Sequence, residues 1–174
     1  MKKLWKIQGF IPYIVILFLN ATTDLAHKIT IQNTLLKSFE GDLLITLSAV
    51  VNALILLPFI LLFSSSGFLS DKFSKITIIR YAALASIPIA LLITVCYYQG
   101  WFIAAFVMTF LLALQSAIYS PAKYGVIKEF VGSENLGPAN GVVQAVTIVA
   151  ILLSSILFSM IFESFILRQK SLMS

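Results

Sequence analysis

The sequence predicts an all-α membrane protein with about five transmembrane helices, and two observations support this prediction. The first is composition: of 174 residues, 60% are hydrophobic and 11% are charged, and the mean hydropathy is +1.01. Soluble domains carry about 25% charged residues, so this chain has too little polar surface to face water on all sides. The second is pattern: five apolar runs approach the roughly 20 residues that span a bilayer, and they lack the period-two alternation of barrel strands.

Glycine, proline, serine and charged clusters bound the five runs. The runs predict a single membrane domain over residues 1–174, with helices over about 7–28, 43–64, 75–98, 101–120 and 138–163. The first run follows three lysines, as the core of a signal peptide does. Four further spans come after it and no small-residue cleavage site does, so we assign it as the first membrane helix.

Few residues are available for catalysis or metal binding. The chain has one histidine, seven carboxylates and one cysteine, Cys96, which lies within an apolar run and is expected to pack there. We find no catalytic constellation, phosphate-binding glycine loop or metal-ligand cluster in the sequence, so we predict no enzyme activity, no cofactor and no metal. The net charge of +5 is dispersed between the spans, which argues against a nucleic-acid partner. A carrier and a membrane anchor remain.

The basic residues predict a cytoplasmic N-terminus, because cytoplasmic segments of membrane proteins are enriched in lysine and arginine. With that orientation, most basic side chains fall in cytoplasmic segments: Lys2, Lys3, Lys6, Lys72, Lys75, Arg80, Lys123 and Lys128. The others fall on the outer side: Lys28, Lys37, Arg168 and Lys170. At the short outer turn after residue 96, we expect Tyr97, Tyr98 and Trp101 to anchor the chain at the level of the headgroups.

The first predicted helix carries a polar stripe within an apolar run. Asn20, Thr23, Asp24 and His27 are spaced i, i+3, i+4 and i+7, which places them on one helix face. A carboxylate at the bilayer centre costs about 2.5–3.5 kcal/mol on insertion scales, so Asp24 needs a partner or a wet cavity. Two interpretations stay open: the stripe is hydrated near the outer headgroups or paired with Lys28, or it lines a transport pathway.

The last predicted helix carries a second polar stripe, because Asn140, Gln144 and Thr147 repeat the i, i+4, i+7 spacing. An adjacent ridge has small residues four apart: Gly137, Gly141 and Ala145. Small residues at this spacing let helix backbones approach closely, and amides can then bond across the contact. Packing and a pathway role are both compatible with this pattern.

Two further polar pairs lie within the spans. Gln115 and Tyr119 share a face of the fourth predicted helix, and Ser48 and Asn52 share a face of the second. Each pair alone is weak evidence for a pathway. Together with the two stripes they favour a bundle with a polar-lined interior.

The segment 67–75, between the second and third predicted helices, resembles motif A of the major facilitator superfamily. That motif has a glycine, three residues, an aspartate and a basic residue, followed by a second glycine and further basic residues; Gly67, Asp71, Lys72 and Lys75 match it, while Ser74 stands at the second glycine. Gly67 permits a tight turn or close helix approach, and the lysines can pair with acids or lipid headgroups. Asp71 can cap the next helix or face the positive N-terminal end of another helix. The resemblance implies a gating latch between two halves of a carrier.

A narrower resemblance lies in segments 18–24, 120–127 and 136–141, which contain Pro121-Ala122-Lys123-Tyr124-Gly125 and Ala139-Asn140-Gly141. These are similar to the bacterial lysophospholipid transporter family, over about residues 8–162. The resemblance implies transport of a lysophospholipid, such as 2-acyl-glycerophosphoethanolamine, from the outer to the inner leaflet of the bacterial inner membrane. It also implies that the chain is a multi-pass protein whose surroundings are membrane lipids.

On this interpretation the polar residues take positions along a substrate pathway. Its polar end is lined by Asn20, Asp24 and His27, its middle by Gln115, Asn140 and Gln144, and its inner, phosphate-facing mouth by Lys123 and Tyr124. A lysine at the mouth would meet a lipid phosphate as a point charge.

The five predicted spans are fewer than the twelve of a major facilitator, which has two six-helix halves. The chain therefore resembles a truncated N-terminal half, and we expect a C-terminal half as partner. A fragment, a half with a separately encoded partner and the head of an interrupted gene all fit. Two alternative functions also remain: a membrane anchor for an acyltransferase and acyl-ACP synthetase, and a facilitator for a small polar solute.

Overall fold

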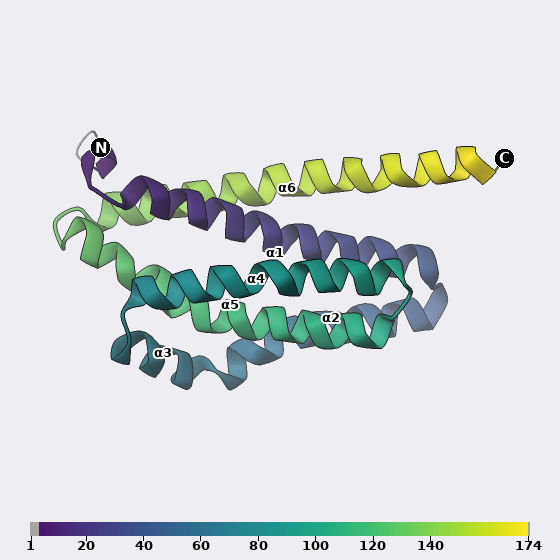
Figure 1. The fold of residues 1–174 in the computed structure, drawn as a ribbon, viewed down its shortest axis with the longest axis horizontal. Helices are drawn as coiled ribbons and strands as arrows, with labels where there is room; N and C mark the ends of the chain where they lie inside the picture. Colours follow the sequence, from purple (N-terminus) through teal and green to yellow (C-terminus); the bar gives the residue numbers. More distant parts are fainter. Residues whose placement is uncertain (1–3, 174) are drawn as a thin grey trace.

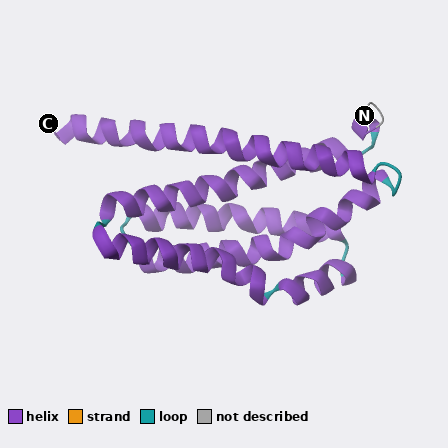
Figure 2. Cartoon of the chain, turned by 180° about the vertical axis from the view of Figure 1, so that it is seen from behind, coloured by secondary structure: helices purple, strands orange, loops and turns teal. Residues whose placement is uncertain are grey.

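The computed structural model describes residues 4–173, without the side chains of 98, 162 and 165–173. Its regular elements are all helical (Figures 1 and 2). A short 3-10 helix, η1 (Leu4–Lys6), precedes the α-helices, which are α1 (Phe10–Ser38), α2 (Gly41–Leu61), α3 (Phe63–Lys72), α4 (Lys75–Tyr98), α5 (Phe102–Val131) and α6 (Leu136–Met173). The predicted all-α fold is confirmed.

Five helices of the described chain are long and apolar enough to cross a membrane. They are α1, α2, α4, α5 and the Leu136–Ile161 part of α6, and α2 has the highest mean hydropathy, 2.5. Within each helix the backbone N–H and C=O groups bond to one another, as they must in lipid, which offers them no hydrogen-bond partners. The chain is therefore a multi-pass membrane protein.

Three of the helices run well beyond the ends predicted for them, and the last of them, α6, continues to Met173 rather than to about 163. α1 continues to Ser38 rather than to about 28, and its 29 residues span about 43 Å, more than the roughly 30 Å hydrocarbon layer. α5 continues through Pro121 to Val131, although the proline removes one backbone hydrogen bond of the helix. Lys123 and Lys128, which we expected at the inner end of the fourth helix and in the loop after it, both lie on α5.

The segment resembling motif A is helical where a loop was predicted. Gly67 lies inside α3, and a side chain at this position would meet open space, so Gly67 provides neither a tight turn nor a close approach. Asp71 lies in the last turn of α3 and is exposed, and the N-cap residue of α4 is Ser74, whose side chain makes no capping hydrogen bond. The expectation that Asp71 caps this helix is wrong. Ser66 and Ser70 are buried on the inner face of α3, which packs against α5.

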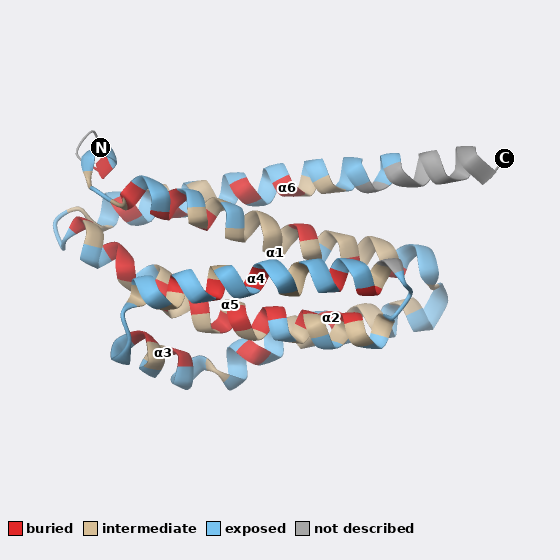
Figure 3. Ribbon diagram, in the orientation of Figure 1, coloured by how far each residue is buried: buried red, intermediate tan, exposed pale blue. Residues whose placement is uncertain are grey.

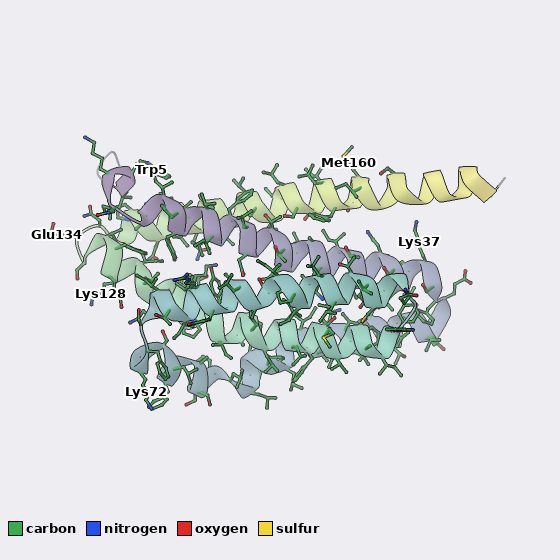
Figure 4. All side chains as sticks on the ribbon, viewed as in Figure 1. Trp5, Lys37, Lys72, Lys128, Glu134 and Met160 are labelled. Carbon is green, nitrogen blue, oxygen red and sulfur yellow. The ribbon has the colours of Figure 1, made fainter. Side chains whose placement is uncertain are left out.

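α5 lies at the centre of the bundle. α4 packs along α5, α2 and α3 pack against it elsewhere, and α6 packs along α1 (Figure 1). We call the end that carries η1, α3 and the α5–α6 connection the basic end, because Lys72 and Lys128 lie there, whereas Lys37 lies at the opposite end (Figure 4).

Two apolar clusters are separated by a polar layer. The cluster at the basic end includes Phe10 and Leu17 of α1, and the other includes Ile31 and Leu35 of the same helix. Between them α1 carries residues 20–27, the predicted polar stripe. Helix association in lipid depends on packing and on interhelical hydrogen bonds, so the two clusters hold the polar layer at a fixed depth.

Candidate functional site

A cavity of about 290 Å³ opens in the polar layer between α1, α2, α5 and α6. Its polar lining consists of Asp24, His27, Lys28, Thr109, Ser116 and Thr147. The remaining lining is apolar and includes Leu25, Phe59 and Leu112. A few polar groups in an apolar wall are typical of a site that orients an amphipathic ligand.

Asp24 is the carboxylate of this cavity. Its Oδ2 accepts a hydrogen bond from Nδ2 of Asn20 at 3.1 Å, and its Oδ1 lies 3.3 Å from Oγ of Ser116 on α5. The Ser116 hydroxyl also lies 3.3 Å from Oε1 of Gln115, and its single proton serves one acceptor at a time. The carboxylate is thus held from two helices and still faces the cavity.

His27 joins the same two helices one turn further along. Its Nε2 lies 3.2 Å from Oγ1 of Thr109, and that hydroxyl donates to the backbone carbonyl of Ala105 at 2.8 Å. Because the threonine proton is used in this way, His27 donates through Nε2, and its Nδ1 is the acceptor in the neutral ring.

Thr109 and Ser116 are site residues that we did not single out from the sequence. A usable pattern was present, since Thr109, Ser116 and Lys123 are seven residues apart and therefore share one face of α5. A lone hydroxyl in an apolar helix often bonds its own backbone, so each residue alone gave little indication of a site.

Lys28 lines the cavity beside the acidic stripe. It is exposed, and no ion pair joins it to Asp24 in the described part of the chain. Pairing with Lys28, one part of the first interpretation of the stripe, is therefore not made, while hydration near the headgroups, the other part, stays a prediction. The ammonium remains available at the cavity edge.

Lys123 lies on α5 toward the basic end, outside the lining of the cavity. Its Nζ lies 5.1 Å from the centroid of the Tyr124 ring, and its positive charge attracts the carboxylate of Asp24. Tyr13 of α1 donates to the backbone carbonyl of Lys123 at 2.6 Å, which fixes this turn of α5 against α1. Tyr124 is 46% exposed.

Gln115 does not line the cavity that contains Asp24, although its Oε1 reaches the Ser116 hydroxyl. It is buried and borders a second cavity between α4 and α5, where its Nε2 has no hydrogen-bond partner among the described residues. Tyr119 is buried in the apolar cluster at the basic end, and its hydroxyl is also without a partner in the described structure. The structure thus separates Gln115 from the residues with which we grouped it.

The polar stripe of α6 is rotated away from the bundle. Asn140 and Gln144 are exposed, because the buried face of α6 is formed by neighbouring positions: Ala139, Val143, Ala150 and Ser154 (Figure 3). Gly137 and Gly141 face open space, so the expected close packing of the small ridge is not made within the described chain. Thr147 is the member of the stripe that reaches the cavity.

The residues matching motif A make contacts at the basic end. Lys75 forms an ion pair with Glu129 of α5 at 2.7 Å, and its methylene groups occupy the space where Gly125 has no side chain. Lys72 lies 5.8 Å from the ring centroids of Phe68 and of Phe73. No group of three His, Cys, Asp or Glu side chains suited to a metal occurs in the described residues.

Comparison with known proteins decides the relationship. Over 149 residues, or 86% of this chain, the sequence is 30% identical to the lysophospholipid transporter LplT of Photorhabdus laumondii. Over 113 residues it is 31% identical to proteins of the same name from Yersinia pestis and Yersinia pseudotuberculosis. The chain is a relative of the lysophospholipid transporters. This similarity confirms the resemblance that we drew from segments 18–24, 120–127 and 136–141.

The similarity covers only part of each relative. The aligned region spans 35% of the Photorhabdus protein and 25% of the Yersinia pestis protein. No family model and no solved structure matches the chain.

Proposed function

We propose that this chain is the N-terminal part of a lysophospholipid carrier and that the cavity around Asp24 receives the polar end of the substrate. The observation that carries the proposal is the lining of the cavity: a carboxylate, an imidazole, an ammonium and three hydroxyl groups in a wall whose other side chains are apolar. A lysophospholipid likewise combines a charged part, its headgroup, with an apolar part, its single acyl chain. The printed names of the relatives support the same substrate class.

Within this proposal, Asn20, Asp24 and His27 form the polar end of the pathway. Asn20 acts through Asp24, which it hydrogen-bonds, and His27 presents its ring at the cavity wall. Lys123 and Tyr124 follow Ser116 on α5 by about two turns toward the basic end and form the mouth that meets the lipid phosphate. Gln115 contributes through Ser116, the residue that contacts both side chains.

We further propose that the remaining helices of a longer carrier cover the exposed polar face. Asn52 of α2 and Asn140 and Gln144 of α6 are exposed on helices that span the membrane, where lipid offers no hydrogen-bond partner. A second half placed against this face would turn these residues toward a shared pathway. Gly67, Asp71, Lys72 and Lys75 would then form the latch that the motif implies.

The orientation is part of the same proposal. More basic side chains lie at the basic end than at the other, so we place this end in the cytoplasm and the protein in the bacterial inner membrane. The anchor for an acyltransferase and acyl-ACP synthetase is not favoured, because an anchor does not require a cavity of this chemistry.

The test is uptake of labelled lysophospholipid into vesicles by the chain completed with the remaining residues of the Photorhabdus laumondii relative. We expect uptake by the completed carrier, none by the 174-residue chain alone, and at least a tenfold loss in Asp24→Ala, because a charged hydrogen-bonding group contributes about 1.5–3 kcal/mol. Asp42→Ala is the control, since Asp42 is an exposed carboxylate at the start of α2. Equal losses in both variants, or uptake of a small solute in place of the lipid, would contradict the proposal.

A further inference from the structure

We propose that the groove between α4 and α5 binds an anionic phospholipid of the surrounding bilayer. The groove is the second cavity, of about 530 Å³, and it lies apart from the cavity around Asp24. The proposed lipid binding does not depend on the proposed transport function. Its lining is almost entirely apolar and includes Ala85 and Ile118, which gives an acyl chain a surface to pack against.

The groove follows the depth profile of a phospholipid. Phe73 borders it at the basic end, Thr77 and Tyr81 follow over the next two turns of α4, and Ala85 lies about 15 Å from the start of that helix. For a lipid of the leaflet at the basic end, the hydroxyl groups of Thr77 and Tyr81 would meet the ester linkages, and Ala82, Ala85 and Ile118 would meet the acyl chain. A lipid of the leaflet at the basic end fits this order.

A positive charge stands at the mouth of the groove. Nζ of Lys72 lies 5.8 Å from the centroid of the Phe73 ring and at the same distance from that of Phe68, which are both exposed. Cation–π contacts with two aromatic rings fix the position of the ammonium group near the membrane surface. Lys72 makes no ion pair within the part of the chain that the structure describes, in contrast to Lys75. The charge complements a lipid phosphate and an anionic headgroup.

Gln115 distinguishes a lipid from a docked helix. It borders the deep end of the groove, and its Nε2 lacks a partner in the described structure. This donor is buried, so an acyl chain in the groove would leave it unused, whereas a docked transmembrane helix would need the Gln115 side chain to turn outward to bond with it. Gln115→Leu should therefore leave lipid binding at least as strong as in the parent.

The experiment is native mass spectrometry of the purified 174-residue chain titrated with phosphatidylglycerol or phosphatidylethanolamine. Lys72→Ala should weaken phosphatidylglycerol binding about fivefold, as expected for one juxtamembrane lysine. Lys128→Ala should not, although Lys128 lies at the same end (Figure 4). Equal effects of the two substitutions would show a diffuse charge effect and overturn the proposal.

A groove-filling variant tests the site itself. Ala85 is exposed, so Ala85→Phe is tolerated by the fold and should reduce binding of both lipids at least threefold, while Ala49→Phe on the exposed surface of α2 should not. Circular dichroism confirms that each variant is helical. Unchanged lipid binding by Ala85→Phe, or loss of binding in Gln115→Leu, would overturn the proposal, the latter in favour of a docked helix.

Discussion

The hydroxyl of Ser116 is the group through which α5 contacts Asp24, with 3.3 Å between Oγ and Oδ1. Ser116→Ala should lower the free energy of unfolding by about 1 kcal/mol, the usual range for an interhelical hydrogen bond in a membrane protein. Unfolding in mixed micelles of detergent and dodecyl sulfate measures this change. Ser120→Ala is the matched control, because no side-chain hydrogen bond is found for Ser120 in the described structure. Equal stability of the two variants would show that the hydrogen bond of Ser116 does not stabilise the polar layer.

Substitution of Lys123 tests the class of substrate. If its ammonium meets the lipid phosphate, Lys123→Ala in the completed carrier should impair lysophospholipid uptake about tenfold, by loss of a charged contact. Lys128→Ala, an exposed lysine on the same helix, controls for the loss of basic charge that orients the chain. Reporter fusions establish first that topology is unchanged. Parent-like uptake by Lys123→Ala would favour a small polar solute over a lipid headgroup.

Residue spacing predicted part of the site. The stripe from Asn20 to His27 lies on one helix, so its common face followed from periodicity alone, and Asp24 and His27 do line one cavity. Thr109 and Ser116 approach from another helix, and the sequence gives no register between α1 and α5. Periodicity also shows which residues share a face but not where that face points, which is why Gln144 lies outside the cavity.

Gly125 links two elements at the basic end. A Cβ atom here would lie 2.6 Å from Cε of Lys75, so the lysine side chain must shift in Gly125→Ala, and we expect the shift to break its ion pair with Glu129. We expect Glu129→Gln to lower the unfolding temperature slightly at low salt, because an exposed ion pair is weak and screened. In the Gly125→Ala background the same substitution should have no effect. A double-mutant cycle followed by thermal unfolding measures this coupling.

The control for this cycle is Glu134→Gln, because Glu134 is exposed beyond the end of α5 and makes no ion pair within residues 4–173. Its effect should be the same in the parent chain and in the Gly125→Ala background. Additive effects of Gly125→Ala and Glu129→Gln would mean that the glycine does not position Lys75.

Helix existence was predictable, and helix ends were not. The apolar runs identify the five spans because lipid selects for them directly. α1, α5 and α6 continue beyond those runs because a helix that leaves the membrane still satisfies its own backbone. α3 was missed because its serines and Gly67 have low helix propensity, and its packing against α5 overrides that preference.

The whole molecule has a predicted orientation. A reporter fused after Ser74, at the basic end, should be cytoplasmic, and reporters fused after Glu40 and after Ser174 should be periplasmic. Paired activity of a periplasmic and a cytoplasmic reporter enzyme gives the location of each fusion. Reporters after Glu40 and Ser74 on the same side would contradict α2 as a membrane span, and reporters after Ser74 and Ser174 on one side would contradict the count of five.

The central claim is that the cavity between α1 and α5 receives a lysophospholipid headgroup, and photolabelling tests it most directly. A lysophosphatidylethanolamine with a photoreactive group on its headgroup is bound to the completed carrier, and mass spectrometry maps the labelled residues. We expect labels within 21–28 and 109–116, removed by excess unlabelled lysolipid and reduced about tenfold in Asp24→Ala. Labels confined to exposed apolar residues of α4, or a pattern unchanged in Asp24→Ala, would contradict it.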